Sequence, residues 1–246
     1  MAKGEDMNAW RFLNSNCFAG IFLGCSLIVC GVCIQRSGLI PAARAAAVQK
    51  PPEIKMSATT VTDLNKATHT LGKPNAPITV IEFYDEQCPY CQEVAQTVFP
   101  VIAGAATEGR IKFIPKLFPL GAIHGHAKKA AEVTFCAGDQ GKFWETSQAL
   151  MGYDDGLDDD GLFDVETKLG LNIPAINTCV ASRKHYADMK ADMAFGKALG
   201  VQGTPTFFIG ETAADGNKAN GVLFPGDATL FRQQLNAEFK KHHFDL

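Results

Sequence analysis

The sequence predicts an α/β protein whose central sheet is interrupted by a block of helices. A β-branched and aromatic run at 78–84 indicates a buried strand, and a second strand pattern follows at 111–118. Strand patterns return only at 206–210 and 221–224, which predict a hairpin. The intervening chain has helical patterns punctuated by Gly, Asn and Asp, at 126–137, 142–151, 161–169, 174–182 and 186–199.

Proline and aspartate mark the ends of the remaining elements. A helix is expected at 88–106, with Pro89 in its first turn, where a missing N–H costs nothing. Pro115 interrupts the second strand and predicts that this strand lies at a sheet edge or a bulge. Asp227 is a typical cap for the amphipathic helix expected at the C-terminal end.

The N-terminal region predicts export. Residues 17–34 carry no charged side chain, with Arg11 before them and Arg36 after them. Such a length lies between a long signal-peptide core and a membrane-spanning helix. Small residues at 41–47 fit a signal-peptidase site, while an uncleaved anchor and a buried helix are the alternatives. We expect 1–47 to be a signal peptide or an inner-membrane anchor and the remaining chain to be periplasmic or otherwise extracytoplasmic.

Charge and cysteine content narrow the function classes. The formal net charge of −3 gives no field to gather nucleic acid or acidic lipid, so no nucleic-acid partner is expected. Of the eight cysteines, four lie in the apolar N-terminal segment, where they are expected to be inert. The others are Cys88, Cys91, Cys136 and Cys179, and an even number in an oxidising compartment indicates paired thiols.

The motif that carries chemistry is Cys88-Pro89-Tyr90-Cys91. Its spacing also suits zinc, but zinc needs a second close pair of ligands, and the other two cysteines of this region lie far apart. A motif that ends a strand and opens a helix points its first sulfur at unpaired backbone N–H groups. These groups favour the thiolate of Cys88, which is the nucleophile in disulfide exchange.

A helix terminus alone cannot account for a strongly acidic thiol. It contributes about 0.3–1 kcal/mol, and about 2 kcal/mol at best, where one pKa unit corresponds to about 1.36 kcal/mol. Strongly oxidising relatives reach thiol pKa values of about 3.5. Because Pro89 and Tyr90 bring no positive charge, we expect a depressed pKa for Cys88 that stays above this extreme. A value above about 7.5 would contradict the prediction.

Neither the acidic run nor the histidines predict a metal ion or a cofactor. In the run 154–161, a calcium loop built on Gly161 would place Gly156 where a carboxylate is required, so a solvated turn is the better interpretation. His124 and His126 have no nearby carboxylate or thiol in the sequence and are interpreted as surface or capping residues.

Two further features accompany the cysteine motif. Glu82 lies on the otherwise apolar first strand, where a carboxyl is costly unless it is functional or hydrogen-bonded. It is expected either to hold and pass a proton near Cys91 or to make a buried hydrogen bond. Thr204-Pro205 precedes the third strand, which suits a cis peptide that exposes the Thr204 backbone to an extended substrate, although a simple turn fits the passage too.

Long stretches of the chain resemble a known family. VIEFYDEQCPYC resembles thioredoxin-fold proteins, and LFPLGAIHGHAKKAAEVTFCAGDQGKFWETSQALM with GVQGTPTFFIG resembles bacterial DsbA-type thiol:disulfide oxidoreductases. The resemblance runs from about Leu71 to the C-terminus. It implies that Cys88 is the attacking thiol, Cys91 the resolving thiol, Pro205 the cis-proline and Glu82 the buried acid of the fold.

The same resemblance implies a thioredoxin fold with an inserted helical domain. The thioredoxin-like domain would comprise 77–121 and 200–246, and the helical insertion 122–199. Residues 48–76 mix Pro, Lys, Thr and Asn, and are expected to form a linker or arm with one short strand near Thr60.

Two positions leave the direction of electron flow open. The prototype oxidase has His in place of Tyr90 and Val in place of Thr204, and both residues of this chain also occur in isomerase-type relatives. The resemblance implies a dithiol oxidase that acts on exported proteins and is reoxidised by a quinone-linked membrane partner. The alternatives are an isomerase or reductase kept reduced by a membrane partner, and a non-catalytic module that binds metal or peptide. The oligomeric state is left open.

Cys136 and Cys179 fall on two predicted helices of the insertion. We expect a structural disulfide between them, worth about 3–4 kcal/mol by loop-closure arguments. Two buried free thiols are the alternative.

Overall fold

The computed structural model describes residues 56–153 and 157–244, so the predicted signal peptide or anchor, residues 1–47, lies outside the described residues. Among the residues that are described, no helix is long and apolar enough to cross a bilayer.

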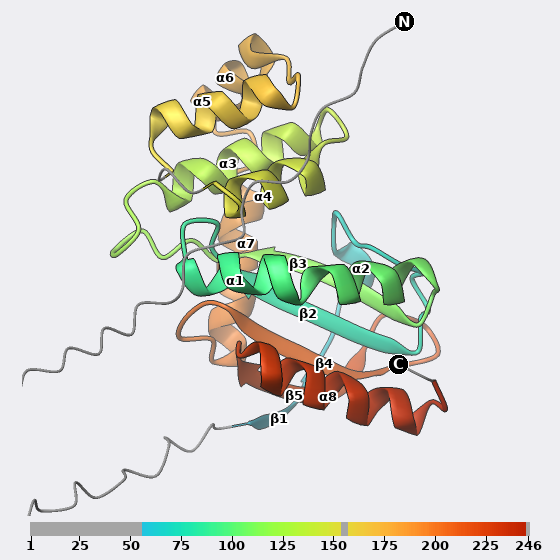
Figure 1. Cartoon of the computed structure of the whole chain (residues 1–246). Coiled ribbons are helices and arrows are strands. Elements are labelled where there is room, and N and C mark those ends of the chain that lie inside the picture. The colour runs from blue at the N-terminus through green and yellow to red at the C-terminus, as the bar shows by residue number, and fades with distance from the viewer. Residues whose placement is uncertain (1–55, 154–156, 245–246) are drawn as a thin grey trace, which may run out of the picture. The chain divides into compact units, whose positions relative to one another are not determined.

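A mixed sheet of five strands lies at the centre of the described part of the chain (Figure 1). The strand order is β1-β5-β4-β2-β3, in which β2 and β3 are parallel and all other neighbours are antiparallel. The predicted first strand and the hairpin are confirmed, and the strand that contains Pro115 lies at an edge, as predicted. The strands are β1 (Ser57–Val61), β2 (Ile78–Tyr84), β3 (Ile111–Leu117), β4 (Thr206–Thr212) and β5 (Ala219–Pro225).

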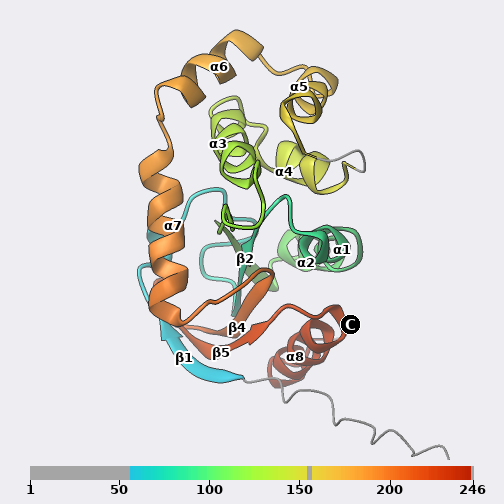
Figure 2. The ribbon, with the colours of Figure 1, turned by 90° about the vertical axis from the view of Figure 1, so that its left-hand side faces the viewer.

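Helices cover both faces of the sheet. The helices are α1 (Pro89–Thr97), α2 (Phe99–Thr107), α3 (Ala127–Gly138), α4 (Phe143–Met151), α5 (Asp159–Lys168), α6 (Ile173–Ala181), α7 (Tyr186–Leu199) and α8 (Ala228–Lys241). Figure 2 shows α1, α2 and α8 on one side of the sheet, α7 on the other, and α3 to α6 beyond one end of the strands. Alternate side chains of the strands enter the two cores: Val80 and Phe207 on the α8 side, and Ile81 and Phe208 on the α7 side.

The helix expected at 88–106 is two helices. α1 ends at Thr97 and α2 begins at Phe99, with Val98 between them in a distorted helical conformation (φ −108°). Pro100, in the first turn of α2, has no N–H to continue the hydrogen-bond ladder, so the helix restarts at this point.

The described part of the expected arm belongs to the sheet. The strand near Thr60 is confirmed as β1, which pairs with β5, and a 3₁₀ turn, η1 (Leu64–Lys66), follows. The ammonium group of Lys112 is buried beneath η1, where it donates hydrogen bonds to the carbonyl oxygens of Leu64 (3.3 Å) and Gly216 (3.0 Å). A charged group buried with such acceptors ties β3, η1 and the β4–β5 turn together.

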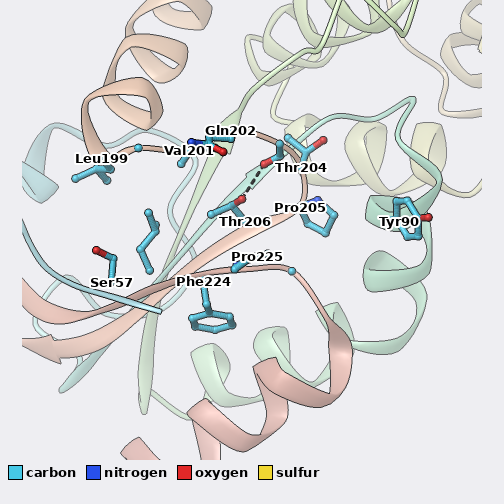
Figure 3. A pocket seen from close by; sticks show the side chains of 14 residues that line it. Ser57, Tyr90, Leu199, Val201, Gln202, Thr204, Pro205, Thr206, Phe224 and Pro225 are labelled. Atoms are coloured by element: carbon cyan, nitrogen blue, oxygen red, sulfur yellow. Dashed lines mark hydrogen bonds between the residues drawn. The ribbon is translucent and has the colours of Figure 1, made fainter. Parts of the chain in front are cut away.

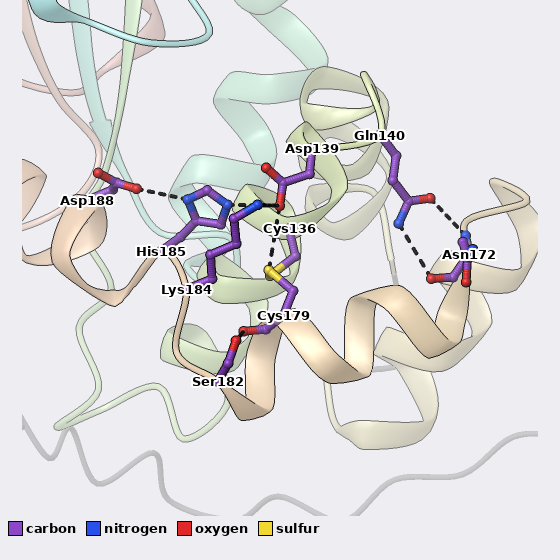
Figure 4. A network of polar contacts seen from close by, with 9 residues as sticks. All are labelled: Cys136, Asp139, Gln140, Asn172, Cys179, Ser182, Lys184, His185 and Asp188. Carbon is purple, nitrogen blue, oxygen red and sulfur yellow. Dashed lines mark hydrogen bonds and ion pairs between the residues drawn. A yellow bond between two sulfur atoms is a disulfide. The ribbon is translucent and has the colours of Figure 1, made fainter.

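The helical insertion is closed by a disulfide. Cys136 of α3 and Cys179 of α6 are bonded, with their Cα atoms 6.0 Å apart, so this prediction is confirmed. Figure 4 shows the bond beside a surface network in which Asp139 contacts Lys184 (2.8 Å) and His185 (3.1 Å). Although Cys179 lies close to Asp139 and His185, its sulfur is held in the disulfide and offers no thiolate to a metal ion.

The acidic run contributes a helix cap within its described residues, 157–161. Asp158 accepts a hydrogen bond from the backbone N–H of Gly161 (2.9 Å) at the start of α5, and exposed Asp159 pairs with Lys129 (2.7 Å). The interpretation of the run as a solvated turn was therefore wrong at 159–161, which form the first turn of α5.

Removal of the disulfide tests its contribution to stability. We expect Cys136→Ala/Cys179→Ala to lower the free energy of unfolding by about 3–4 kcal/mol, because the unfolded chain regains the entropy of a long closed loop. Urea unfolding of the variant and the wild type, with Cys88 and Cys91 in the same redox state, measures the difference. An unchanged midpoint would contradict this contribution.

Candidate active site

The two thiols of the motif lie at the start of α1. Cys88 caps the helix in an extended conformation and Pro89 occupies its first turn, as predicted. Cys88 and Cys91 are both buried and both free thiols in this structure, whereas the ring of Tyr90 is 68% exposed. A short turn after β2 thus delivers one sulfur to the helix terminus and the other to the protein interior.

The surroundings of the two sulfurs shift their pKa values in opposite directions. A hydrogen bond from the Cys91 thiol, together with the backbone N–H groups of Cys91 and Tyr90, lowers the pKa of Cys88 to about 5 against the opposing effect of burial. The direction of this shift agrees with the depressed value expected from the sequence. Burial and the neighbouring Cys88 raise the pKa of Cys91 well above its ordinary value. At neutral pH, Cys88 is a thiolate and Cys91 keeps its proton.

The loop before β4 completes the surroundings of Cys88. The Thr204–Pro205 peptide is cis, as expected. A protonated Cys88 sulfur donates to the Thr204 carbonyl oxygen at 3.3 Å, a bond that the thiolate cannot make. The Thr204 hydroxyl also lowers the pKa of Cys88, and its oxygen is buried with no hydrogen-bond partner among the described residues. It is therefore available to donate to the thiolate.

A cavity of about 720 Å³ opens beside this loop. In Figure 3 the Thr204–Pro205 segment lies between Tyr90 and the edge-strand residue Ser57, with Phe224 and Pro225 of β5 below it. The cavity therefore borders the motif and exposes the backbone before the cis-proline.

Glu82 lies on β2, where it pairs in register with Pro115 of β3 and Phe207 of β4. Its side chain is buried. Burial raises its pKa to about 8, so the carboxyl holds a proton at neutral pH. When ionised, the Glu82 carboxylate adds a small contribution to the raised pKa of Cys91.

Asp85, which no sequence pattern identified as a site residue, lies between β2 and the motif. Its buried carboxylate accepts hydrogen bonds from the backbone N–H groups of Gln87 (2.8 Å) and Leu120 (2.7 Å) and lies 2.8 Å from Nδ1 of His124. The interpretation of His124 as a surface or capping residue was therefore wrong, since its side chain is only 16% exposed. His126 is more exposed and caps α3 through its backbone only.

Glu86, the next residue, was not identified from the sequence either. It is buried and accepts a hydrogen bond from the Thr134 hydroxyl of α3 at 2.5 Å, while burial raises its pKa to about 8. Nearby, Ser147 of α4 donates to the phenol oxygen of Tyr84 at 3.0 Å. The end of β2 is thus joined to the helical insertion by buried polar contacts. The one sequence feature that could have identified Asp85 and Glu86 as site residues is their position, as two consecutive acidic residues directly after a buried strand.

The role of the Thr204 hydroxyl is tested by Thr204→Val, which keeps the side-chain shape. We expect the pKa of Cys88 to rise by about one unit, because a hydrogen bond to a charged group is worth roughly 1.5–3 kcal/mol. The ultraviolet absorbance of the thiolate as a function of pH measures this change. Thr97→Val, at an exposed hydroxyl that bonds within α1, is the matched control, and identical curves for Thr204→Val and wild type would refute the role.

The buried Glu82 carboxyl predicts a dependence of stability on pH. Its pKa is raised on folding, so the folded state binds the proton more tightly and stability falls as the pH rises from about 4.5 to 8. Glu82→Gln should remove this loss of stability with rising pH. The free energy of unfolding of the variant should exceed that of the wild type by roughly a few kcal/mol at pH 8 and by little at pH 4. Urea unfolding at both pH values checks it, with Glu93→Gln on the exposed face of α1 as control. Equal gains at the two pH values would contradict the prediction.

Comparison with known proteins identifies the family of this chain and several partial relatives. A family model described as thioredoxin matches residues 64–221, more than half of the chain. A Na(+)/H(+) antiporter NhaA 1 of Salinispora arenicola is 31% identical over 141 residues, which are 57% of this chain and 21% of that protein. Another, of Mycolicibacterium gilvum, is 28% identical over 171 residues, which are 69% of this chain and 26% of that protein. The chain thus spans only about a fifth to a quarter of the length of these relatives.

Solved structures of similar fold include three bacterial proteins. A thioredoxin-like oxidoreductase from Silicibacter pomeroyi DSS-3 has a TM-score of 0.59 and 24% identity, covering 72% of this chain and 96% of that one. Alpha-DsbA1 of Wolbachia pipientis has a TM-score of 0.56 and 22% identity, covering 79% and 94%. BdbD of Bacillus subtilis has a TM-score of 0.56 and 21% identity, covering 75% and 99%. The chain therefore belongs to the thioredoxin family and has the fold of the DsbA-like proteins.

Proposed function

We propose that the protein is an exported thiol–disulfide oxidoreductase that introduces disulfides into other exported proteins through Cys88. The observation that carries the proposal is the separation of the two thiol acidities, with the pKa of Cys88 lowered to about 5 and that of Cys91 raised. Surroundings that stabilise the thiolate stabilise the reduced enzyme, and a stabilised reduced form makes the Cys88–Cys91 disulfide a stronger oxidant.

The reaction follows from this separation. A substrate thiolate attacks Cys88 Sγ of the oxidised pair, forming a mixed disulfide while the electrons of the broken S–S bond pass to Cys91 Sγ. Glu82 holds a proton at neutral pH and supplies it to the departing Cys91 sulfur. A second substrate thiolate then attacks the substrate sulfur of the mixed disulfide. Cys88 leaves as a stable thiolate, so two substrate thiols have become one disulfide.

The groove beside the cis-proline loop supports a protein substrate. Its walls include exposed Tyr90, the backbone before Pro205 and the end of β5. An extended segment of the substrate would lie along this backbone, with its cysteine at Cys88. Cys88 Sγ lies within hydrogen-bond distance of the Thr204 carbonyl oxygen, so a substrate paired with this backbone would bring its sulfur close to the reacting one.

An extracytoplasmic location fits the structural disulfide. The Cys136–Cys179 bond is of a kind that persists in oxidising compartments. The enzyme would be secreted into the periplasm or held at the inner membrane by residues 17–34, and a quinone-linked membrane partner would reoxidise its dithiol. Tyr90 and Thr204 favour a second candidate, an isomerase or reductase kept reduced by a membrane partner.

The reduction potential of the Cys88–Cys91 pair separates the candidates. Equilibration against glutathione should give a value above about −180 mV, between that of protein disulfide isomerase and that of the DsbA prototype at about −120 mV. A value near that of thioredoxin, about −270 mV, would overturn the oxidase in favour of the isomerase or reductase.

Turnover separates both enzymes from a binding module. The wild type should oxidise a reduced, unfolded protein, and Cys88→Ala should not, whereas Cys136→Ala/Cys179→Ala should retain the activity at a temperature where it is folded. A wild type that turns over neither thiols nor disulfides would refute catalysis and favour a module that only binds.

A further inference from the structure

Asp85 holds together three segments around the active site. Its Oδ1 accepts from Gln87 N–H and closes the turn that leads to Cys88, while its Oδ2 accepts from Leu120 N–H in the loop after β3. The carboxylate is fully buried, and a buried charge is costly unless it is paired and hydrogen-bonded. Its remaining partner is His124, whose Nδ1 lies 2.8 Å from Oδ2.

The backbone of the same residue bonds to both cysteines of the motif, to the sulfur of Cys91 and to the backbone N–H of Cys88. The Asp85 N–H donates to Cys91 Sγ at 3.5 Å, and the Asp85 carbonyl oxygen accepts from Cys88 N–H at 3.0 Å. The Cys91 thiol in turn makes the hydrogen bond that lowers the pKa of Cys88 most. A displacement of Asp85 would therefore change the geometry between the two sulfurs, although its carboxylate touches neither of them.

The orientation of His124 follows from the chemistry of its partner. Because an ionised carboxylate only accepts hydrogen bonds, Nδ1 must carry the hydrogen in the Asp85–His124 contact. The ring sits in the loop between β3 and α3, which Leu120 N–H also fixes to Asp85. The histidine thus completes the set of donors that keeps a buried charge next to the motif.

We propose that Asp85 and His124 are positioning residues for thiol–disulfide exchange: His124 fixes the Asp85 carboxylate, and Asp85 fixes the turn that presents the Cys91 thiol to Cys88. The inference rests on the proposed function in that Cys88 is the reacting thiol, and it holds for either direction of electron flow.

The test compares His124→Leu, which removes the donor, with His124→Asn, whose amide nitrogen takes nearly the place of Nδ1. In the reduced protein, we expect His124→Leu to slow the alkylation of Cys88 at pH 5.5 about tenfold, because less of it is thiolate. His124→Asn should restore most of the rate. His126→Leu is the matched control and should react like the wild type, since its ring makes only a long contact with exposed Asp159 (3.8 Å).

Two outcomes would overturn the inference. A folded His124→Leu with the wild-type alkylation profile would mean that the pair affects stability alone. Should that variant not fold, nitrogen NMR of the wild type decides: we expect hydrogen on Nδ1 of His124 and resonances that shift between the oxidised and reduced protein, unlike those of His126. An Nδ1 of His124 that carries no hydrogen would refute the proposed hydrogen bond from His124 to Asp85. A wild type whose Cys88 does not react with disulfides would instead refute the proposed function.

Discussion

The placement of the buried Cys91 thiol beside Cys88, at the start of α1, is the constraint on which the chemistry of the site depends. This thiol lowers the pKa of Cys88 more than any other group does, because Cys91 is held in the interior, where burial keeps its proton in place. The fold supplies this geometry from distant parts of the chain. The pairing of β2 with β4 brings Cys88 to Thr204, although 116 positions separate them.

Three buried carboxyl groups lie on β2 and on the turn between β2 and the cysteine motif, and their protonation decides how much charge is buried there. Glu82 and Glu86 both have pKa values raised to about 8 by burial, so neither carries a charge at neutral pH. Asp85 is satisfied by two backbone donors and His124. Glu86 also accepts a hydrogen bond from Thr134 of α3, so the turn before the cysteine motif is fixed to the helical insertion as well.

Local sequence patterns predicted the parts of the fold that depend on local physics. The apolar run of β2, the helix α7, the capping of α8 by Asp227 and the cysteine at the start of α1 follow from periodicity and from capping or turn chemistry. The disulfide was expected from the even number of cysteines and from their positions on two predicted helices, and the resemblance favoured the cis-proline over a simple turn. Contacts between distant segments left no such pattern: His124 meets Asp85 across 39 positions, and Lys112 is buried in a strand that reads as apolar and basic. Pro100 indicates the break between α1 and α2, but the helical pattern of 88–106 is continuous and predicted a single helix.

The most direct test of this account is the stability of the reduced protein relative to the oxidised one. Reductant is added in an amount that opens only the Cys88–Cys91 pair, as verified by mass, and unfolding in urea is compared at pH 7 and at pH 4.5. Because folding depresses the pKa of Cys88 from 9.0 to about 5, the thiolate stabilises the reduced form fully above pH 9 and in part at pH 7. This stabilisation is lost as the pH falls through about 5. The account predicts a reduced form that is the more stable at pH 7, by a margin that shrinks at pH 4.5. An oxidised form that is the more stable at pH 7, or a margin independent of pH, would contradict it.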